Sequence, residues 1–304
     1  MVSFRFHLVS LVAVFLALGL GVLTGTTVLN RGIVTQLERQ TDQLAETSSR
    51  LREQVRDLQT EVEAWGSFGG EVAGFVVEGR LTGQEAVLVT QEGTDTLAID
   101  RVRRGLEAAG AELLAVLSVD ERIAVEDEAD AMELARMLET EETDPEALGR
   151  EAAGMLAERL LGGPRGPDLL ERLVGSGFLL NRGPGLGTPA LRDVGRPGQA
   201  VVVVAGGTGE PVLDPERFLV PFVADLAENG GLVAAGEGMD SQYPFVTRLR
   251  SDPTVSRLIV TQDNVDRLPG EVGLVLALAG LFEDRRPGHY GVKAGADGAI
   301  PPLS

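Results

Sequence analysis

Cysteine is absent from this chain of 304 residues, which excludes disulfide bonds, thiolate metal sites and cysteine nucleophiles. Histidine occurs only as His7 and His289, and lysine only as Lys293, so arginine supplies nearly all of the basic side chains. The 46 acidic residues outnumber the 27 basic ones, which gives a formal net charge of -19. Because a surface of that sign repels nucleic acid and anionic lipid head groups, we predict no nucleic-acid binding.

Common catalytic motifs are missing as well: no G-x-S-x-G, H-E-x-x-H or Walker A sequence occurs. The stretch VVVVAGGTGEP places glycines after a predicted strand, as phosphate loops do. It lacks the G-x-G-x-x-G spacing, however, and Glu210 would repel a phosphate. General-base catalysis by His289 would need a partner that the sequence does not place, so we interpret it as a turn residue. We therefore predict no enzyme and no catalytic or cofactor-binding residues, with an α/β enzyme as the last alternative.

The N-terminal segment is the longest apolar run of the chain. Residues 8–30 carry no charge, and residues 8–29 would span about 33 Å as an α-helix, close to the thickness of a bilayer's hydrocarbon core. A secretory signal usually has a shorter apolar region and an A-x-A-like cleavage site, so we predict a retained transmembrane anchor rather than a cleaved signal.

Small residues recur at every fourth position of this segment, and that spacing lets two membrane helices approach closely. The candidate packing positions are Ala13, Ala17, Gly21 and Gly25. The alternative interpretation is that glycine and alanine are simply common in membrane helices.

A heptad pattern follows the anchor and is the strongest periodic signal in the sequence. Apolar and short hydroxyl residues alternate in steps of four and three, with neither glycine nor proline between Ile33 and Trp65. The pattern predicts a parallel two-stranded coiled coil, and so a homodimer joined through anchor and stalk. The alternative is a single amphipathic helix that lies on its own globular domain. The predicted seam consists of Val34, Leu37, Thr41, Leu44, Ser48, Leu51, Val55, Leu58, Val62 and Trp65.

The orientation of the anchor is not decided by charge, because Arg5 lies on one side of it and Arg31 and Arg39 lie on the other. The order of parts is more informative: a short basic start, an apolar run and then a large acidic region without a further span. This order is typical of a signal anchor, so we predict a single-pass membrane protein with most of the chain outside the cytoplasm.

The remainder alternates short apolar runs with amphipathic segments. We predict strands at 86–90, 112–118, 200–205 and 232–236, and a further strand from 257. Helices are predicted at 95–109, from about 215 with Asp214 as N-cap, and at 270–284. The last of these contains only 11 uncharged residues and is interpreted as a buried core helix. For the acidic run at 119–146 we predict a solvated helix and a loop, with metal capture as the alternative.

These elements predict an α/β fold with a mainly parallel sheet covered by helices on both faces, which is a three-layer architecture. The predicted domains are the N-terminal tail and anchor at 1–31, the coiled coil at 32–66, the α/β domain at 67–290 and a Gly/Pro-rich tail at 291–304.

Three stretches carry a resemblance to a known family: MVSFRFHLVSLVAVFLALGLGVLTG, TQDNVDRLPGEVGLVLALAGL and GHYGVKAGADGAIPP. With the heptads, they resemble the actinobacterial family named for the mycobacterial copper transport protein B, over essentially the full chain. The resemblance implies a cell-envelope protein of copper homeostasis that helps to export copper or forms a channel. Corynebacterial relatives look instead like coiled-coil partners of a membrane protein in septal cell-wall remodelling.

No copper ligand can be carried over from this family by position, because the matching stretches contain anchor, helix and tail. A copper site would be expected to use Cys, Met or His. Met132 and Met137 are five residues apart, which does not place them on one helix face. The resemblance thus makes copper a transported or sensed ion and not an evident cofactor, while the residues alone favour a scaffold that docks a membrane-protein partner.

Overall fold

The computed structural model describes residues 4–183, 191–209 and 211–302, and only the backbone of residues 26–35. The chain divides into two compact units, Met1–Ser67 and Phe68–Ser304. The long helix α1 (Phe4–Val77) supplies all of the described first unit and its last residues belong to the second.

The first unit is one uninterrupted helix. Its apolar part, Phe4–Gly25, has a mean hydropathy of 2.4 and is long enough to cross a membrane, which confirms the predicted N-terminal apolar helix. It is the one such helix in the part of the chain that the structure describes. Thr24, Thr41 and Thr60 donate their hydroxyl hydrogen bonds to carbonyl oxygens four residues earlier, so the helix itself satisfies these polar groups.

The second unit, which we call the head, contains a mixed sheet. In the described residues seven strands pair in the order β3-β2-β1-β4-β5-β6-β7. All neighbours are parallel except β2 and β3, so the predicted mainly parallel sheet is confirmed. The strands are β1 (Glu85–Gln91), β2 (Glu112–Val119), β3 (Leu179–Asn181), β4 (Ala200–Ala205), β5 (Leu232–Glu237), β6 (Val260–Asp263) and β7 (Gly288–Tyr290).

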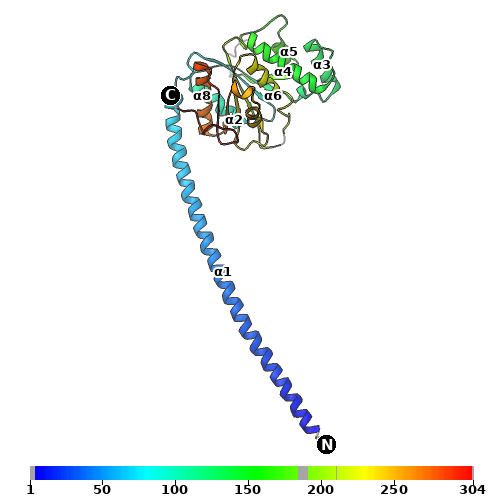
Figure 1. The fold of residues 1–304 in the computed structure, drawn as a ribbon, viewed down its shortest axis with the longest axis vertical. Coiled ribbons are helices and arrows are strands. Elements are labelled where there is room, and N and C mark those ends of the chain that lie inside the picture. Colours follow the sequence, from blue (N-terminus) through cyan, green and yellow to red (C-terminus); the bar gives the residue numbers. More distant parts are fainter. Residues whose placement is uncertain (1–3, 184–190, 210, 303–304) are drawn as a thin grey trace. The chain divides into compact units, whose positions relative to one another are not determined.

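Helices cover both faces of this sheet, as predicted for three layers (Figure 1). One core cluster joins α2 (Thr96–Ala108) and α8 (Leu268–Asp284) to one face, through strand residues such as Leu88 and Val202. The other cluster uses the alternate strand residues, such as Val89 and Val203. It packs against α3 (Glu128–Leu138), α4 (Pro145–Gly162), α5 (Leu169–Gly175), α6 (Leu219–Glu228) and α7 (Phe245–Ser251).

Two predicted element boundaries are wrong by a few residues. Helix α6 begins at Leu219 and not near 215, because residues 215–218 form a turn in which Asp214 accepts hydrogen bonds from the amides of Glu216 and Arg217. The strand predicted from 257 begins at Val260, because the preceding residues, Val255–Arg257, form a 3-10 turn.

The acidic run at 119–146 contains a 3-10 turn at Glu121–Ala124, helix α3 and a loop, as expected for a solvated helix with a loop. Helix α3 nevertheless buries Leu134, Met137 and Leu138 against the core. Helix α4, which was not predicted, begins after this loop, with Asp144 as its N-cap and Pro145 in its first turn.

Candidate functional site

The carboxyl ends of β5 and β6 lie side by side because the two strands are parallel, and each ends in an acidic residue. Glu237 ends β5 and Asp263 ends β6, and both side chains are almost fully buried. Buried carboxylates need hydrogen-bond donors or opposite charges, since desolvation otherwise favours their protonated form. The sheet thus brings together two acids that the sequence places 26 residues apart.

Arg250, on α7, supplies the positive charge for Asp263. Its Nη1 lies 2.9 Å from Asp263 Oδ2, and both side chains are at most 2% exposed. The same guanidinium donates to Thr261 Oγ1 at 2.8 Å and to the Tyr290 carbonyl oxygen at 2.6 Å. Because nearly all of its donors are used, Arg250 holds β6 and the segment after β7 in one arrangement.

Residues 291–302, here called the terminal strap, are bound by this cluster. Asp263 accepts hydrogen bonds from the amide of Val292 at 2.6 Å and from the amide of Lys293 at 3.0 Å. Gly291 has a φ of +126° and a Cβ at this position would overlap the Asp263 carboxylate, so only glycine lets the strap approach this closely.

Lys293 completes the cluster. Its ammonium group forms an ion pair with Glu237 and donates to the Gly238 carbonyl oxygen at 2.9 Å. Glu237 also accepts from the Val246 amide at 2.7 Å. Burial raises the pKa of the Glu237 carboxyl above its ordinary value, while the hydrogen bond from Lys293 acts in the opposite direction. The only lysine of the chain therefore serves to fasten the strap.

The start of α8 packs against β6 with little free space. Gln262 is fully buried, and its amide nitrogen donates to the Asp263 carbonyl at 2.9 Å and to Asn264 Oδ1 at 2.8 Å. A Cβ on Gly273 would come within 2.9 Å of Gln262 Cδ, and one on Gly270 would overlap the Asn264 carbonyl. The stretch GHYGVKAGADGAIPP thus contains the strap, and the stretch TQDNVDRLPGEVGLVLALAGL supplies most of the residues that hold it. We call the holding residues, namely Glu237, Arg250, His289 and residues 261–273, the strap's seat.

His289 lies on the edge strand β7, where it pairs with Thr261 of β6. Its interpretation as a turn residue is therefore wrong. Its Nδ1 lies 2.9 Å from Thr261 Oγ1, which also accepts from Arg250. Burial lowers the pKa of His289, and the neighbouring Arg250 guanidinium lowers it further. The neutral imidazole therefore acts as part of the strap's seat.

The glycine loop after β4 lies at the same edge of the sheet. Gly206, Gly207 and Thr208 line a cavity of about 140 Å³ together with Asp95, Asp240, Ser241, Asp266 and Arg267. Arg267 pairs with both Asp240 and Asp266, at 3.1 and 3.2 Å. A phosphate there would face three carboxylates, those of Asp95, Asp240 and Asp266, which would repel it. Glu210 itself lies outside the described residues.

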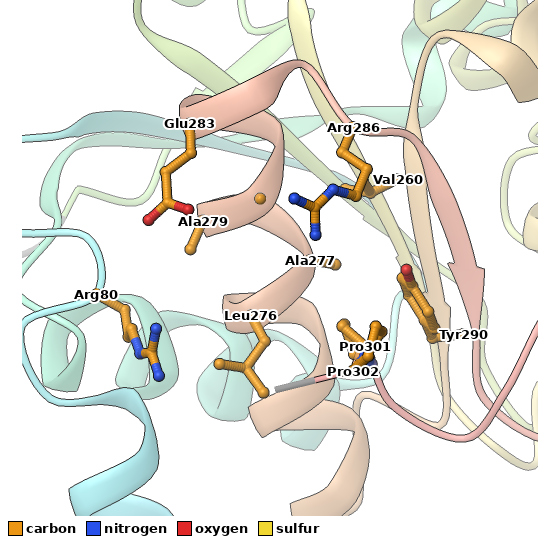
Figure 2. Close-up of a pocket in the computed structure, with 11 residues that line it drawn as sticks. Arg80, Val260, Leu276, Ala277, Ala279, Glu283, Arg286, Tyr290, Pro301 and Pro302 are labelled. Carbon is orange, nitrogen blue, oxygen red and sulfur yellow. The ribbon is translucent and has the colours of Figure 1, made fainter. Parts of the chain in front are cut away.

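A small groove with a mixed polar and apolar lining runs beside the second half of α8, where the strap ends (Figure 2). Leu276, Ala277 and Gly280 form its floor and Pro301 closes one side, while Arg80 and Arg286 stand at its rim. Its volume of about 40 Å³ admits little more than water. The groove therefore marks the far end of the strap's contact with the head.

Candidate metal donors do not converge in the described part of the chain. No group of three or more His, Asp or Glu residues there could hold a metal ion. Met132 and Met137 lie on α3, where Met132 is exposed and the sulfur of Met137 contacts Ser176 Oγ. Met239 follows β5 and is partly exposed.

The predicted packing residues of the first unit all lie on α1. Ala13, Ala17 and Gly21 are exposed, and a Cβ on Gly21 or Gly25 would meet nothing within 4 Å. The seam residues from Leu37 to Trp65 present large apolar side chains that are 52–71% exposed in the single chain. The Val34 side chain lies outside the described residues. The seam residues with exposed large apolar side chains are Leu37, Leu44, Leu51, Val55, Leu58, Val62 and Trp65.

Comparison with known proteins gives one consistent result. A family model described as "Copper transport outer membrane protein, MctB" matches residues 1–301. The copper transporter MctB of Mycobacterium tuberculosis is 27% identical over 310 residues, which cover 97% of this chain and 98% of that protein. The protein of the same name from Mycobacterium leprae is 26% identical over 343 residues, which cover 99% of this chain and 100% of that protein.

Proposed function

The chain belongs to the MctB family of copper transport outer membrane proteins, and from this membership we propose that it serves copper homeostasis as a membrane-anchored dimer of the cell envelope. The observation that carries the proposal is the match over residues 1–301, which includes the apolar helix, the heptads, the head and the strap. The relatives that it resembles over nearly their full length are named copper transporters.

We propose further that copper handling depends on the assembled protein or on a membrane partner, and not on a ligand cluster in the head. The described methionines and histidines are spread over several elements: His7 on α1, Met132 and Met137 on α3, Met155 on α4, Met239 after β5 and His289 on β7. His289 is, moreover, bound to Thr261 in the strap's seat. Copper is then cargo or signal for the assembly.

The exposed seam on α1 supports dimerisation. Leaving seven large apolar side chains more than half exposed is unfavourable in water, and a second copy in parallel register would cover them. The apolar helix continues into this seam without interruption, so close packing at Gly21 and Gly25 would bring two seams together. The same seam favours the second candidate function, a scaffold that docks a membrane partner in septal cell-wall remodelling.

The experiment that tests the proposal is growth across a copper gradient, with a deletion strain complemented by variants of the chain. Leu58→Asp places a charge in the seam, whereas the matched control Thr60→Asp places one on the outer face of the same helix turn. We expect copper sensitivity on deletion, rescue by wild type and Thr60→Asp, and no rescue by Leu58→Asp. Normal copper tolerance after deletion would refute the copper role, and septation defects alone would favour the scaffold.

Orientation is tested separately, and the absence of cysteine makes the test clean. Arg192→Cys introduces one thiol at an exposed position of the head. A membrane-impermeant maleimide should label this variant in cells whose cytoplasmic membrane is intact. Labelling only after lysis would place the head in the cytoplasm and contradict this part of the proposal.

A further inference from the structure

A larger cavity, of about 520 Å³, lies at the carboxyl end of β1 and is separate from the strap and its seat. Its lining includes Glu92, Thr94, Ile99, Ser118 and Arg182. No described residue of β4 lines it, so the cavity lies on the β2 side of the switch point between β1 and β4, over the carboxyl ends of β1 and β2. In open α/β sheets, ligands bind outside the carboxyl ends of the strands, and the volume falls within the usual range for small-molecule sites.

The cavity exists because helix α2 does not cover the whole of the neighbouring strand. Val116 and Ser118 are two residues apart on β2 and therefore point to the same face of the sheet, the face packed by α2 and α8. Ile99 and Arg103, on α2, form one wall. The opposite wall is the end of β3, which the Arg182 amide joins to the Val116 carbonyl at 2.8 Å.

Polar groups of this lining are left without partners. Thr94 is only 8% exposed, and its hydroxyl has no hydrogen-bond partner in the described part of the chain. Arg182 is exposed, and its guanidinium is in no ion pair with a described residue. A buried hydroxyl without a partner costs free energy, which rotation of the Thr94 side chain toward a ligand hydroxyl in the cavity would recover.

Charge restricts the chemistry of the ligand. The lining holds two acids, Glu92 and Asp100, and two bases, Arg103 and Arg182, so it has no net charge. Arg103 is already compensated by Asp100 at 3.6 Å and Glu107 at 3.2 Å. An anion would meet Glu92 and a cation would meet Arg182, whereas hydroxyl groups can both donate to the carboxylate and accept from the guanidinium.

We infer that this cavity binds a neutral polyhydroxylated ligand, a sugar of one or two rings. Glu92, Thr94, Ser118 and Arg182 would hydrogen-bond its hydroxyl groups, and Ile99 with Val116 would contact the apolar face of a ring. The inference does not rest on the proposed role in copper homeostasis, because neither the seam nor the strap takes part in it.

The test is saturation-transfer NMR on the full chain in nanodiscs, with D-glucose, N-acetyl-D-glucosamine and cellobiose as probes and glucose 6-phosphate as the charged comparison. Arg182→Ala removes an exposed donor, and Thr96→Trp fills the cavity from an exposed position in the first turn of α2. The matched controls are Arg192→Ala and Thr143→Trp, which change exposed residues elsewhere.

We expect saturable transfer to at least one neutral sugar, a loss of affinity of about tenfold or more in Arg182→Ala, and no binding in Thr96→Trp, with the controls unchanged. Because all four positions are exposed, unchanged melting temperatures should show that folding is intact. Absence of saturable binding by all three neutral sugars would overturn the inference. So would tighter binding of glucose 6-phosphate, or binding that survives Thr96→Trp.

Discussion

Two glycines on α8 should respond to the same substitution with opposite signs. Gly273 faces Gln262, and an added Cβ would come within 2.9 Å of Gln262 Cδ. Gly280 lies two turns later and lines the groove beside α8, and an added Cβ there would meet nothing within 4 Å. Gly273→Ala therefore tests the packing of the strap's seat, and Gly280→Ala is its matched control on the same helix.

The magnitudes follow from competing terms. Alanine gains about 1 kcal/mol over glycine inside a helix, so Gly280→Ala should stabilise the head by up to about 1 kcal/mol. At Gly273 the same gain is opposed by overpacking, which costs about 1–3 kcal/mol. Gln262 is fully buried and cannot move into solvent, so its amide hydrogen bonds to the Asp263 carbonyl and to Asn264 are also weakened, by about 1–3 kcal/mol. We expect Gly273→Ala to lose about 1–5 kcal/mol overall.

Scanning calorimetry of the full chain measures both changes. For a unit of this size about 1 kcal/mol corresponds to about 2–4 °C, so Gly273→Ala should lower the melting temperature of the head by about 2–20 °C. Gly280→Ala should raise it by about 1–4 °C. If the two variants shift in the same direction, helix propensity and not packing governs α8, and the described seat is wrong.

Four further predictions concern the strap, the seam, the anchor and pH. Asp263→Asn leaves the buried guanidinium of Arg250 without its counter-charge, so the free energy of unfolding should fall by about 3–5 kcal/mol. Amide hydrogen exchange across 291–302 should rise as well, and unchanged exchange there would contradict the role of Asp263 in holding the strap. Leu58→Asp should shift the chain from dimer to monomer in sedimentation, and a variant that still sediments as a dimer would rule out the seam. Gly21→Ile should reduce energy transfer between labelled copies in vesicles, and equal transfer would show that the small residues do not mediate contact. Because the pKa of His289 is lowered in the folded chain, its contribution to stability is complete above the ordinary value of 6.5 and is lost as the pH falls below it. His289→Gln should therefore reduce the loss of unfolding free energy between about pH 7.5 and about pH 5. If wild type and variant show the same slope of unfolding free energy against pH, the reasoning is refuted.

The central elements of the head could be predicted because each carries a strong local pattern. The run AVVVVA is apolar throughout, as expected for a strand buried on both faces, and it forms β4. Helix α2 agrees with the helix predicted at 95–109: Asp95 caps its start, and Gly110 follows its end in a left-handed conformation. Such elements are fixed by burial and capping within one stretch of the chain.

The strap's seat could not be predicted, because its residues converge only in the folded sheet. Asp263 follows an apolar run and is followed by Asn264, so it looks like the beginning of a loop. Its burial results from Arg250 on α7 and from the strap, which lies 28 or more residues further along the chain. The short edge strands β3 and β7 have three residues each and give no periodic signal. The one readable hint was the isolated Lys293 in an otherwise arginine-based chain.

That isolated lysine gives the chain a built-in reporter. An amine-directed acylating reagent finds no other side chain to modify, so a label found on the C-terminal peptide reports on position 293 without any engineering, apart from any label on the N-terminal amine. While Lys293 is paired with Glu237 and bonded to the Gly238 carbonyl oxygen, its amine is held away from the reagent. The rate of acylation of the native chain would then measure how often this end detaches, and would do so in intact cells.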